Sequence, residues 1–157
     1  MSKVIDSIIW PALRFTEPTG TVMVCRERND LLTARYIGIP DLAKLSEVYL
    51  IDSEGIRFDF RGLRLDGPPP SLVKRMLLKV TNPLVRITGE VTGRPDPVSL
   101  DAVKETVGKS VMRHKDYWWE IDDPAAIVTE IERADSVLAI ARVLEGNVSA
   151  MSGEQPL

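Results

Sequence analysis

The sequence predicts an α+β protein in which helices pack on one face of a mainly antiparallel sheet. Runs that alternate apolar and polar residues lie in roughly the first hundred positions, and runs with helical spacing dominate the remainder. Turn signals rich in Gly and Pro separate the runs, and this order of strands before helices is typical of the class. Strands are expected near 21–26, 47–52, 56–65 and 84–92, and helices near 71–80, 99–113 and 124–145.

Length and composition predict a single domain over 1–146 and a flexible tail over 147–157. The chain has 157 residues, a net charge of −3, 44% hydrophobic and 27% charged residues. Such a chain is long enough to bury a core, and its composition is ordinary for a globular protein. The slightly acidic balance gives no general electrostatic reason to expect a nucleic acid or an anionic membrane as partner.

The N-terminal segment predicts neither a secretory signal nor a membrane span, because Asp6 and Pro11 interrupt its apolar run. We therefore expect a cytoplasmic protein. The apolar residues of 3–10 stand at helical spacing, which predicts either a short amphipathic helix that stops at Pro11 or an edge segment. A turn is expected at 16–20.

The strand expected at 21–26 has apolar residues on both faces, which predicts a buried position in the sheet. Its single Cys25 excludes an intramolecular disulfide and is interpreted as a small buried residue rather than a reactive thiol. A polar loop is expected at 26–30, and either a helix or a strand at 31–37. One or two helical turns are expected at 40–45.

The stretch 46–66 predicts the β-hairpin around which the chain is organised. Asp52 can accept from the backbone two residues further on, and Gly55 can take the positive φ that closes such a turn. Apolar residues then occupy alternate positions but change parity at Gly62, so we expect a β-bulge there that keeps them on one face. The alternative is that one strand ends at Arg61 and another begins. These apolar residues are Ile56, Phe58, Phe60, Leu63 and Leu65.

Apolar stripes at a spacing of three and four residues predict the three helices. The helix at 71–80 is expected to end at Asn82-Pro83, after which the strand at 84–92 is closed by a turn that begins at Gly93. Ser99 predicts the N-cap of the helix at 99–113.

The last helix, at 124–145, is expected to begin after an Asp123 cap and to stop at Gly146. It also carries apolar residues outside its main stripe, which predict a second buried side that another copy of the chain could cover. These residues are Val128, Val137, Ile140 and Val143.

Motifs for most chemistries are missing from the sequence, so no catalytic residue, metal or cofactor is predicted. There is no glycine-rich phosphate loop and no nucleophile elbow, and one histidine with one cysteine leaves little for a metal site. A carboxylate-only metal site stays open. His114, between two cations, is interpreted as a solvated residue at a helix C-terminus, with a poised general base as the alternative.

The segment 113–123, RHKDYWWEIDD, has an unusual composition because three aromatic residues separate a basic cluster from an acidic one. Trp, Tyr and Arg are common anchors of protein interfaces, so we expect an interface here. The alternative is that one Trp fills the core while the other covers its edge, since neighbours in an extended segment point in opposite directions. The interface candidates are Arg113, His114, Tyr117, Trp118, Trp119, Glu120 and Asp122.

These observations lead to the hypothesis of a small, acidic protein-binding module, such as an immunity-type inhibitor or an adaptor. Its partner would be another protein, and a homo-oligomer through the last helix, a structural subunit, is a further hypothesis. Neither a nucleic acid nor a membrane is expected as partner. The main alternative is a small-molecule-binding protein or an enzyme with a pocket between sheet and helices, where His114 or a carboxylate would act with Arg57 or Arg61.

Overall fold

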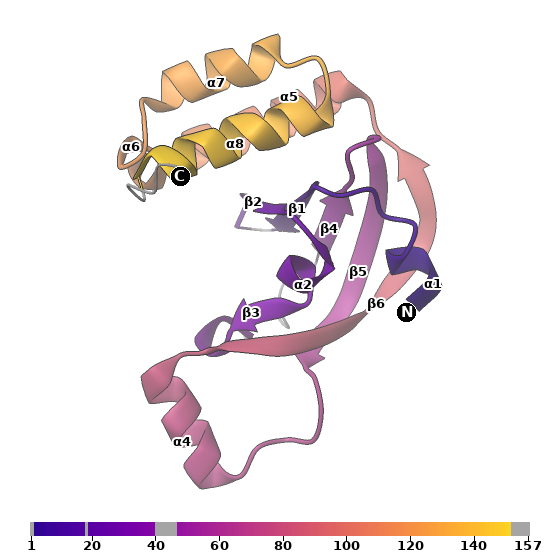
Figure 1. Ribbon diagram of the computed structural model, residues 1–157, viewed down its shortest axis with the longest axis vertical. Coiled ribbons are helices and arrows are strands. Elements are labelled where there is room, and N and C mark those ends of the chain that lie inside the picture. Colours follow the sequence, from indigo (N-terminus) through magenta and orange to yellow (C-terminus); the bar gives the residue numbers. More distant parts are fainter. Residues whose placement is uncertain (1, 18, 40–46, 152–157) are drawn as a thin grey trace, which may run out of the picture.

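The computed structural model of the protein describes residues 2–17, 19–39 and 47–151, and it confirms the α+β class. Within these residues a six-stranded antiparallel sheet has the order β2-β1-β4-β5-β6-β3 (Figure 1). The strands are β1 (Ala12–Glu17), β2 (Thr21–Cys25), β3 (Thr33–Arg35), β4 (Glu47–Ile51), β5 (Ile56–Leu65) and β6 (Leu84–Pro97). The helices are α1 (Ser2–Ile5), α2 (Arg28–Leu31), η1 (Tyr36–Gly38), α4 (Leu72–Thr81), α5 (Leu100–Arg113), α6 (Lys115–Trp119), α7 (Pro124–Arg133) and α8 (Val137–Met151). The helical turns predicted for 40–45 lie outside the described residues.

Strand β1 was not predicted, and it changes the place of β2 in the sheet. β1 pairs with β2 on one side and with β4 on the other, so that Leu13 lies between Val24 and Ile51. β2 is therefore an edge strand, and the prediction that it is buried on both faces is wrong. Its valines do pack against the helical core, whereas Met23, on the opposite face, remains 40% exposed.

The turn between β4 and β5 joins three parts of the chain through the buried carboxylate of Asp52, which is 1% exposed. Its Oδ1 accepts from the N–H groups of Glu54 and Ile56, both at 3.0 Å, and its Oδ2 accepts from that of Ile9 at 3.3 Å. Gly55 takes a φ of 80° and its carbonyl accepts from the N–H of Val98 at 2.8 Å. The predicted turn is thus confirmed. It is also hydrogen-bonded to the segment before β1, through Ile9, and to the segment after β6, through Val98.

The bulge predicted at Gly62 is present. The pairing of β5 with β6 shifts register between Arg61 and Arg64, and Gly62 has a φ of 64°. The parity change places Phe58, Phe60 and Leu63 in one core with Ile56 packed against it, so the prediction of one shared apolar face is confirmed for these four residues. Leu65 lies outside that core. β6 is longer than predicted, because it passes Gly93 and ends at Pro97 opposite Ile56.

Two hydrophobic cores lie on the two faces of the sheet. On one face, side chains of β1 and β4 such as Phe15 and Tyr49, whose rings stack at 4.9 Å, pack under α5, α7 and α8. On the other face the curled sheet closes with α1 and α2 around the phenylalanines of β5. β4 contributes to both cores, with Val48 and Leu50 on one side and Tyr49 and Ile51 on the other.

The single helix predicted for 124–145 is wrong, because two helices occupy this region. α7 ends at Arg133, and Ala134 has an extended backbone with a ψ of 140°. Ser136 then caps α8, since its Oγ accepts from the N–H of Ala139 at 3.1 Å. α8 continues through Gly146 to Met151, so the predicted stop is also wrong. The caps predicted at Ser99 and Asp123 are confirmed.

α4 departs most from the expected arrangement. It was expected to pack on the sheet together with the other helices, but none of its residues is buried and it stands away from the body beyond the far ends of β5 and β6 (Figure 1). Both ends of α4 have capping residues of the types that helices commonly use. Ser71 Oγ accepts from the N–H of Lys74 at 3.4 Å, and Asn82 closes the helix with a φ of 43°.

The substitution Gly62→Val is expected to lower the free energy of unfolding by roughly 1–2 kcal/mol, because a β-branched residue is strained at positive φ. A Cβ at this position would have only the flexible end of Arg64 nearby, at 3.9 Å, so the loss would report backbone strain. Urea unfolding measures it. Gly146→Ala, in the open interior of α8, is the control and should add about 0.5–1 kcal/mol. A loss near zero for Gly62→Val would argue against the bulge.

Removal of the Asp52 carboxylate is expected to cost at least roughly 2 kcal/mol, because Asp52→Ala leaves three backbone N–H groups without their acceptor. Asp52→Asn keeps one acceptor oxygen and should lose less. Both values come from chemical denaturation followed by circular dichroism. Equal losses in the two variants would contradict this account, because Asn keeps both the side-chain volume and one acceptor oxygen, whereas Ala keeps neither.

Candidate functional site

The aromatic segment predicted as an interface is helical, since Tyr117, Trp118 and Trp119 all belong to α6. Trp118 is only 6% exposed and fills the core below α5 and α8, and its ring meets that of Tyr117 edge-on at 5.2 Å. Tyr117 and Trp119 are 57% and 59% exposed. One tryptophan is therefore a core residue, and the exposed part of the segment is smaller than its composition indicates.

The basic candidates of the segment contact the β1–β2 hairpin, and its acidic candidates follow α6. His114 ends α5 and its Nε2–H donates to the carbonyl of Thr19 at 2.7 Å, which ties the β1–β2 hairpin to the helices. Arg113 lies against Gly20 of the same hairpin. Glu120 is exposed after α6, and Asp122 Oδ1 accepts from the N–H of Asp123 at 2.7 Å.

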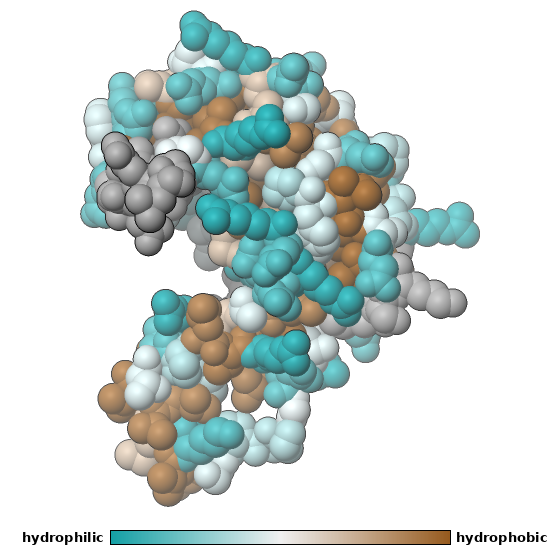
Figure 2. Space-filling view, in the orientation of Figure 1, coloured by the Kyte–Doolittle hydropathy of each residue, from teal (hydrophilic) through white to brown (hydrophobic). Residues whose placement is uncertain are grey.

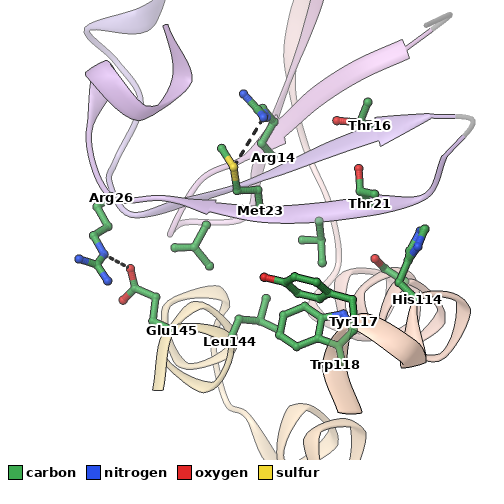
Figure 3. A pocket seen from close by; sticks show the side chains of 13 residues that line it. Arg14, Thr16, Thr21, Met23, Arg26, His114, Tyr117, Trp118, Leu144 and Glu145 are labelled. Carbon is green, nitrogen blue, oxygen red and sulfur yellow. Dashed lines mark hydrogen bonds and ion pairs between the residues drawn. The ribbon is translucent and has the colours of Figure 1, made fainter. Parts of the chain in front are cut away.

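A groove with a volume of about 550 Å³ follows β2, and we call it the β2 groove. Three of the predicted residues, His114, Tyr117 and Trp118, line it on the helical side together with Leu144 (Figure 3). The hairpin contributes side chains from both faces of β2. One face presents Val22 and Val24, and the other presents Thr21 and Met23, which lie beside Arg14 and Thr16 of β1.

Arg14 is the unusual residue of the β2 groove. Its Nε and Nη1 are buried and have no hydrogen-bond partner. Its Nη2 has a weak acceptor, the Met23 sulfur at 3.6 Å. A guanidinium carries five N–H donors, and buried donors without acceptors are rare and costly. The groove therefore contains a cation with two buried nitrogens that have no acceptor among the residues that the structure describes.

The second candidate site is the exposed face of α4, which sequence reasoning assigned to the core. Large apolar side chains cover this helix and the adjoining ends of β6 and η1, and Figure 2 shows them gathered over the projecting part of the molecule. Val80 is 85% exposed. We call this the arm surface. It consists of Ile37, Leu72, Val73, Met76, Leu77, Val80 and Leu84.

The arm surface has a hollow at its base and a positive rim. The hollow holds about 380 Å³ and lies between η1, Leu65 and Lys79. Asn82 anchors it, since Asn82 Oδ1 accepts from the N–H of Ile37 at 3.1 Å. α4 has three basic residues and no acidic one in the sequence LVKRMLLKVT.

The structure places the residues named for the enzyme alternative in two separate hollows. Arg57 lies 3.9 Å above the ring of Tyr49 and is paired with Asp59 at 2.9 Å, in a hollow that it shares with Arg61. His114 lines the β2 groove instead. Within the described ranges no group of three or more His, Cys, Asp and Glu side chains could hold a metal ion. None of the described helices has the length and apolar character needed to cross a bilayer.

Comparisons of the chain with protein families, with curated proteins and with solved structures find no match. The β2 groove and the arm surface are therefore the two features of the molecule from which a function can be proposed. The sequence singled out three residues that line the β2 groove, His114, Tyr117 and Trp118, as interface candidates, and it did not single out Arg14. The signal for Arg14 was present, because a single arginine interrupts the apolar pair Leu13 and Phe15 in a run of strand-forming residues.

Cys25, at the end of β2, is expected to resist thiol reagents in the folded protein. Burial raises the pKa of its thiol from 9.0 to about 11, against a smaller lowering by Arg14. At a pH between 9.0 and about 11, the folded protein therefore holds little of the reactive thiolate form of Cys25. Iodoacetamide labelling followed by mass spectrometry at pH about 9 should be slow in buffer and fast in urea. Equal rates in the two conditions would contradict the burial of this residue.

Proposed function

We propose that this protein is a binding module whose arm surface docks into an apolar, acid-rimmed groove of another protein. The observation that carries the proposal is a ten-residue helix with no buried residue and a continuous apolar stripe. An isolated helix of this length is marginal in water, and packing of an apolar face normally supplies its stability. Nothing in the described part of the chain packs on that face, so we infer that a partner does.

The spacing on α4 suits a helix-in-groove contact. Val73, Met76, Leu77 and Val80 stand at i, i+3, i+4 and i+7, which is the pattern by which an amphipathic helix inserts anchors into a partner. Complete burial of each such side chain is worth roughly 1.5–3 kcal/mol. The hollow beside Lys79 would in turn accept a side chain of the partner.

Charge favours an acidic partner over a second copy of the chain. Lys74, Arg75 and Lys79 flank the stripe, and α4 has no carboxylate with which a twin helix could pair. Two α4 helices packed together would therefore bring like charges close, which disfavours that dimer. Of the four residues on which the dimer through the last helix was predicted, Val137 and Ile140 are buried within the chain, and Val128 and Val143 are partly buried against the same core.

The test compares the wild-type protein with the double variant Met76→Glu and Leu77→Glu. Both side chains are more than half exposed, so the variant should stay within about 0.5 kcal/mol of wild-type stability. Each protein is used to capture partners from a lysate of the source organism. Binding of the purified partner is then measured by calorimetry at low and high salt. We expect one stoichiometric partner, lost in the variant and bound more weakly as salt rises.

Trp119→Ala is the matched control, since it removes an equally exposed apolar side chain from the helical end of the molecule. It should keep the partner. Loss of the partner in this control, with retention in the α4 variant, would assign the interface to α6 and overturn the proposal. Binding of the purified wild-type protein to phosphatidylserine vesicles, abolished in the α4 variant, would replace the protein partner by a lipid surface.

A further inference from the structure

β2 ends the strand order, so one side of its backbone has no neighbouring strand among the described residues. Edge strands are usually protected by charges, proline or a cover, because their unpaired N–H and C=O groups recruit other strands. The segment TVMVC has neither a charge nor a proline. The helices lie below its valines, and Met23 on the other face is exposed.

The β2 groove reaches around this edge to both faces of the strand. On one face it is lined by Arg14 and Met23, which are directly paired across the two strands. On the other face it is lined by apolar side chains, among them Val22, Val24 and Leu144 (Figure 3). The backbone of β2 separates the two halves. A compact molecule cannot fill both, but an extended chain beside β2 can, because its side chains alternate between the faces.

Each half indicates the type of side chain that would enter it. The guanidinium of Arg14 has two buried N–H-bearing nitrogens without acceptors, and a carboxylate is the partner that fits such a fork. The Met23 thioether, which touches Nη2, is flexible enough to move aside. On the helical side, Tyr117, Trp118 and the two valines offer apolar contacts and no charge.

Two side-chain contacts, one at each end of the β2 groove, set the length of the site. At one end Arg26 Nε donates to Glu145 Oε1 at 2.6 Å, and at the other His114 bonds to Thr19 at 2.7 Å. Figure 3 shows Arg26 and His114 at opposite ends of β2, with Tyr117 and Leu144 between them. The five residues of β2 span roughly 17 Å. The space therefore suits about five residues of extended chain.

We propose that the β2 groove binds an extended peptide segment in which acidic and apolar residues alternate, added as a further strand to the edge of the sheet. Main-chain hydrogen bonds to β2 would supply affinity, and the alternating side chains would supply specificity. The acidic residues face Arg14 and the apolar residues face α6 and α8. This site is independent of the arm surface, which lies at the opposite end of the molecule (Figure 1).

The probe is a blocked seven-residue peptide in which valine alternates with glutamate, labelled for fluorescence anisotropy. It should bind saturably, and Arg14→Gln should weaken it by at least about tenfold, because the charged hydrogen bonds are lost. Arg28→Gln, whose arginine pairs with Asp6 outside the groove, is the matched control and should bind as wild type. Hydrogen exchange should show newly protected amides in β2 of the complex.

Two altered peptides keep the test decisive even if Arg14→Gln fails to fold. A twin with lysine in place of glutamate should not bind, and a twin with N-methylated valines should lose binding because it cannot pair with the strand. The proposal is overturned if the valine–glutamate peptide does not bind or if the lysine twin binds equally. Equal binding of the N-methylated twin, or displacement by free glutarate at the same concentration, would indicate a small-carboxylate site instead. Protection of the β2 edge in a dimer without peptide would assign it to a second copy.

Discussion

The buried carboxylate of Asp52 is the interaction on which the arrangement of the sheet depends. A charged group with 1% exposure is stable only when its hydrogen bonds are made, and here the turn and the N-terminal segment make them together. Ser53 strengthens the same junction, because its N–H donates to the carbonyl of Ile9 at 3.0 Å. β1 therefore enters the sheet beside β4. Val98, bonded to Gly55, fixes where the chain leaves β6 for the helices.

With β1 held beside β4, the sheet has a core on each face, and both candidate surfaces follow from that. The helices cover the face formed by Phe15 and Tyr49, while the curled sheet covers the face formed by Phe58 and Phe60. No face remains on which α4 could pack, so this helix projects with its apolar stripe in solvent. β2 is displaced to the edge by β1, and one side of its backbone has no neighbouring strand in the described part of the chain.

The β2 groove and the arm surface have a similar chemical composition although they lie at opposite ends of the molecule. Each combines exposed apolar groups with cations that have no ion-pair partner among the described residues, namely Lys74 and Arg75 in α4 and Arg14 in the β2 groove. A net charge of −3 hides both, because it averages these sites with acidic residues elsewhere. Local charge beside apolar surface is therefore more informative about partners here than the total charge.

Features that depend on near neighbours could be read from the sequence by itself. The turn at Asp52, the bulge at Gly62 and the caps at Ser99 and Asp123 are local geometries that particular side chains require. The cap at Ser136 that divides the last helical region was a local signal too, but an unbroken apolar stripe concealed it.

Only the tertiary structure decided which apolar stripes are covered. Periodicity shows which side chains share a face, whereas burial depends on whether a distant element reaches that face. α4 and α5 have similar amphipathic patterns, yet Val107 is buried and Met76 is solvent-exposed. For the same reason the place of Arg14 in a groove built with α6 and α8 could not be foreseen, since it arises from contacts between the two ends of the chain.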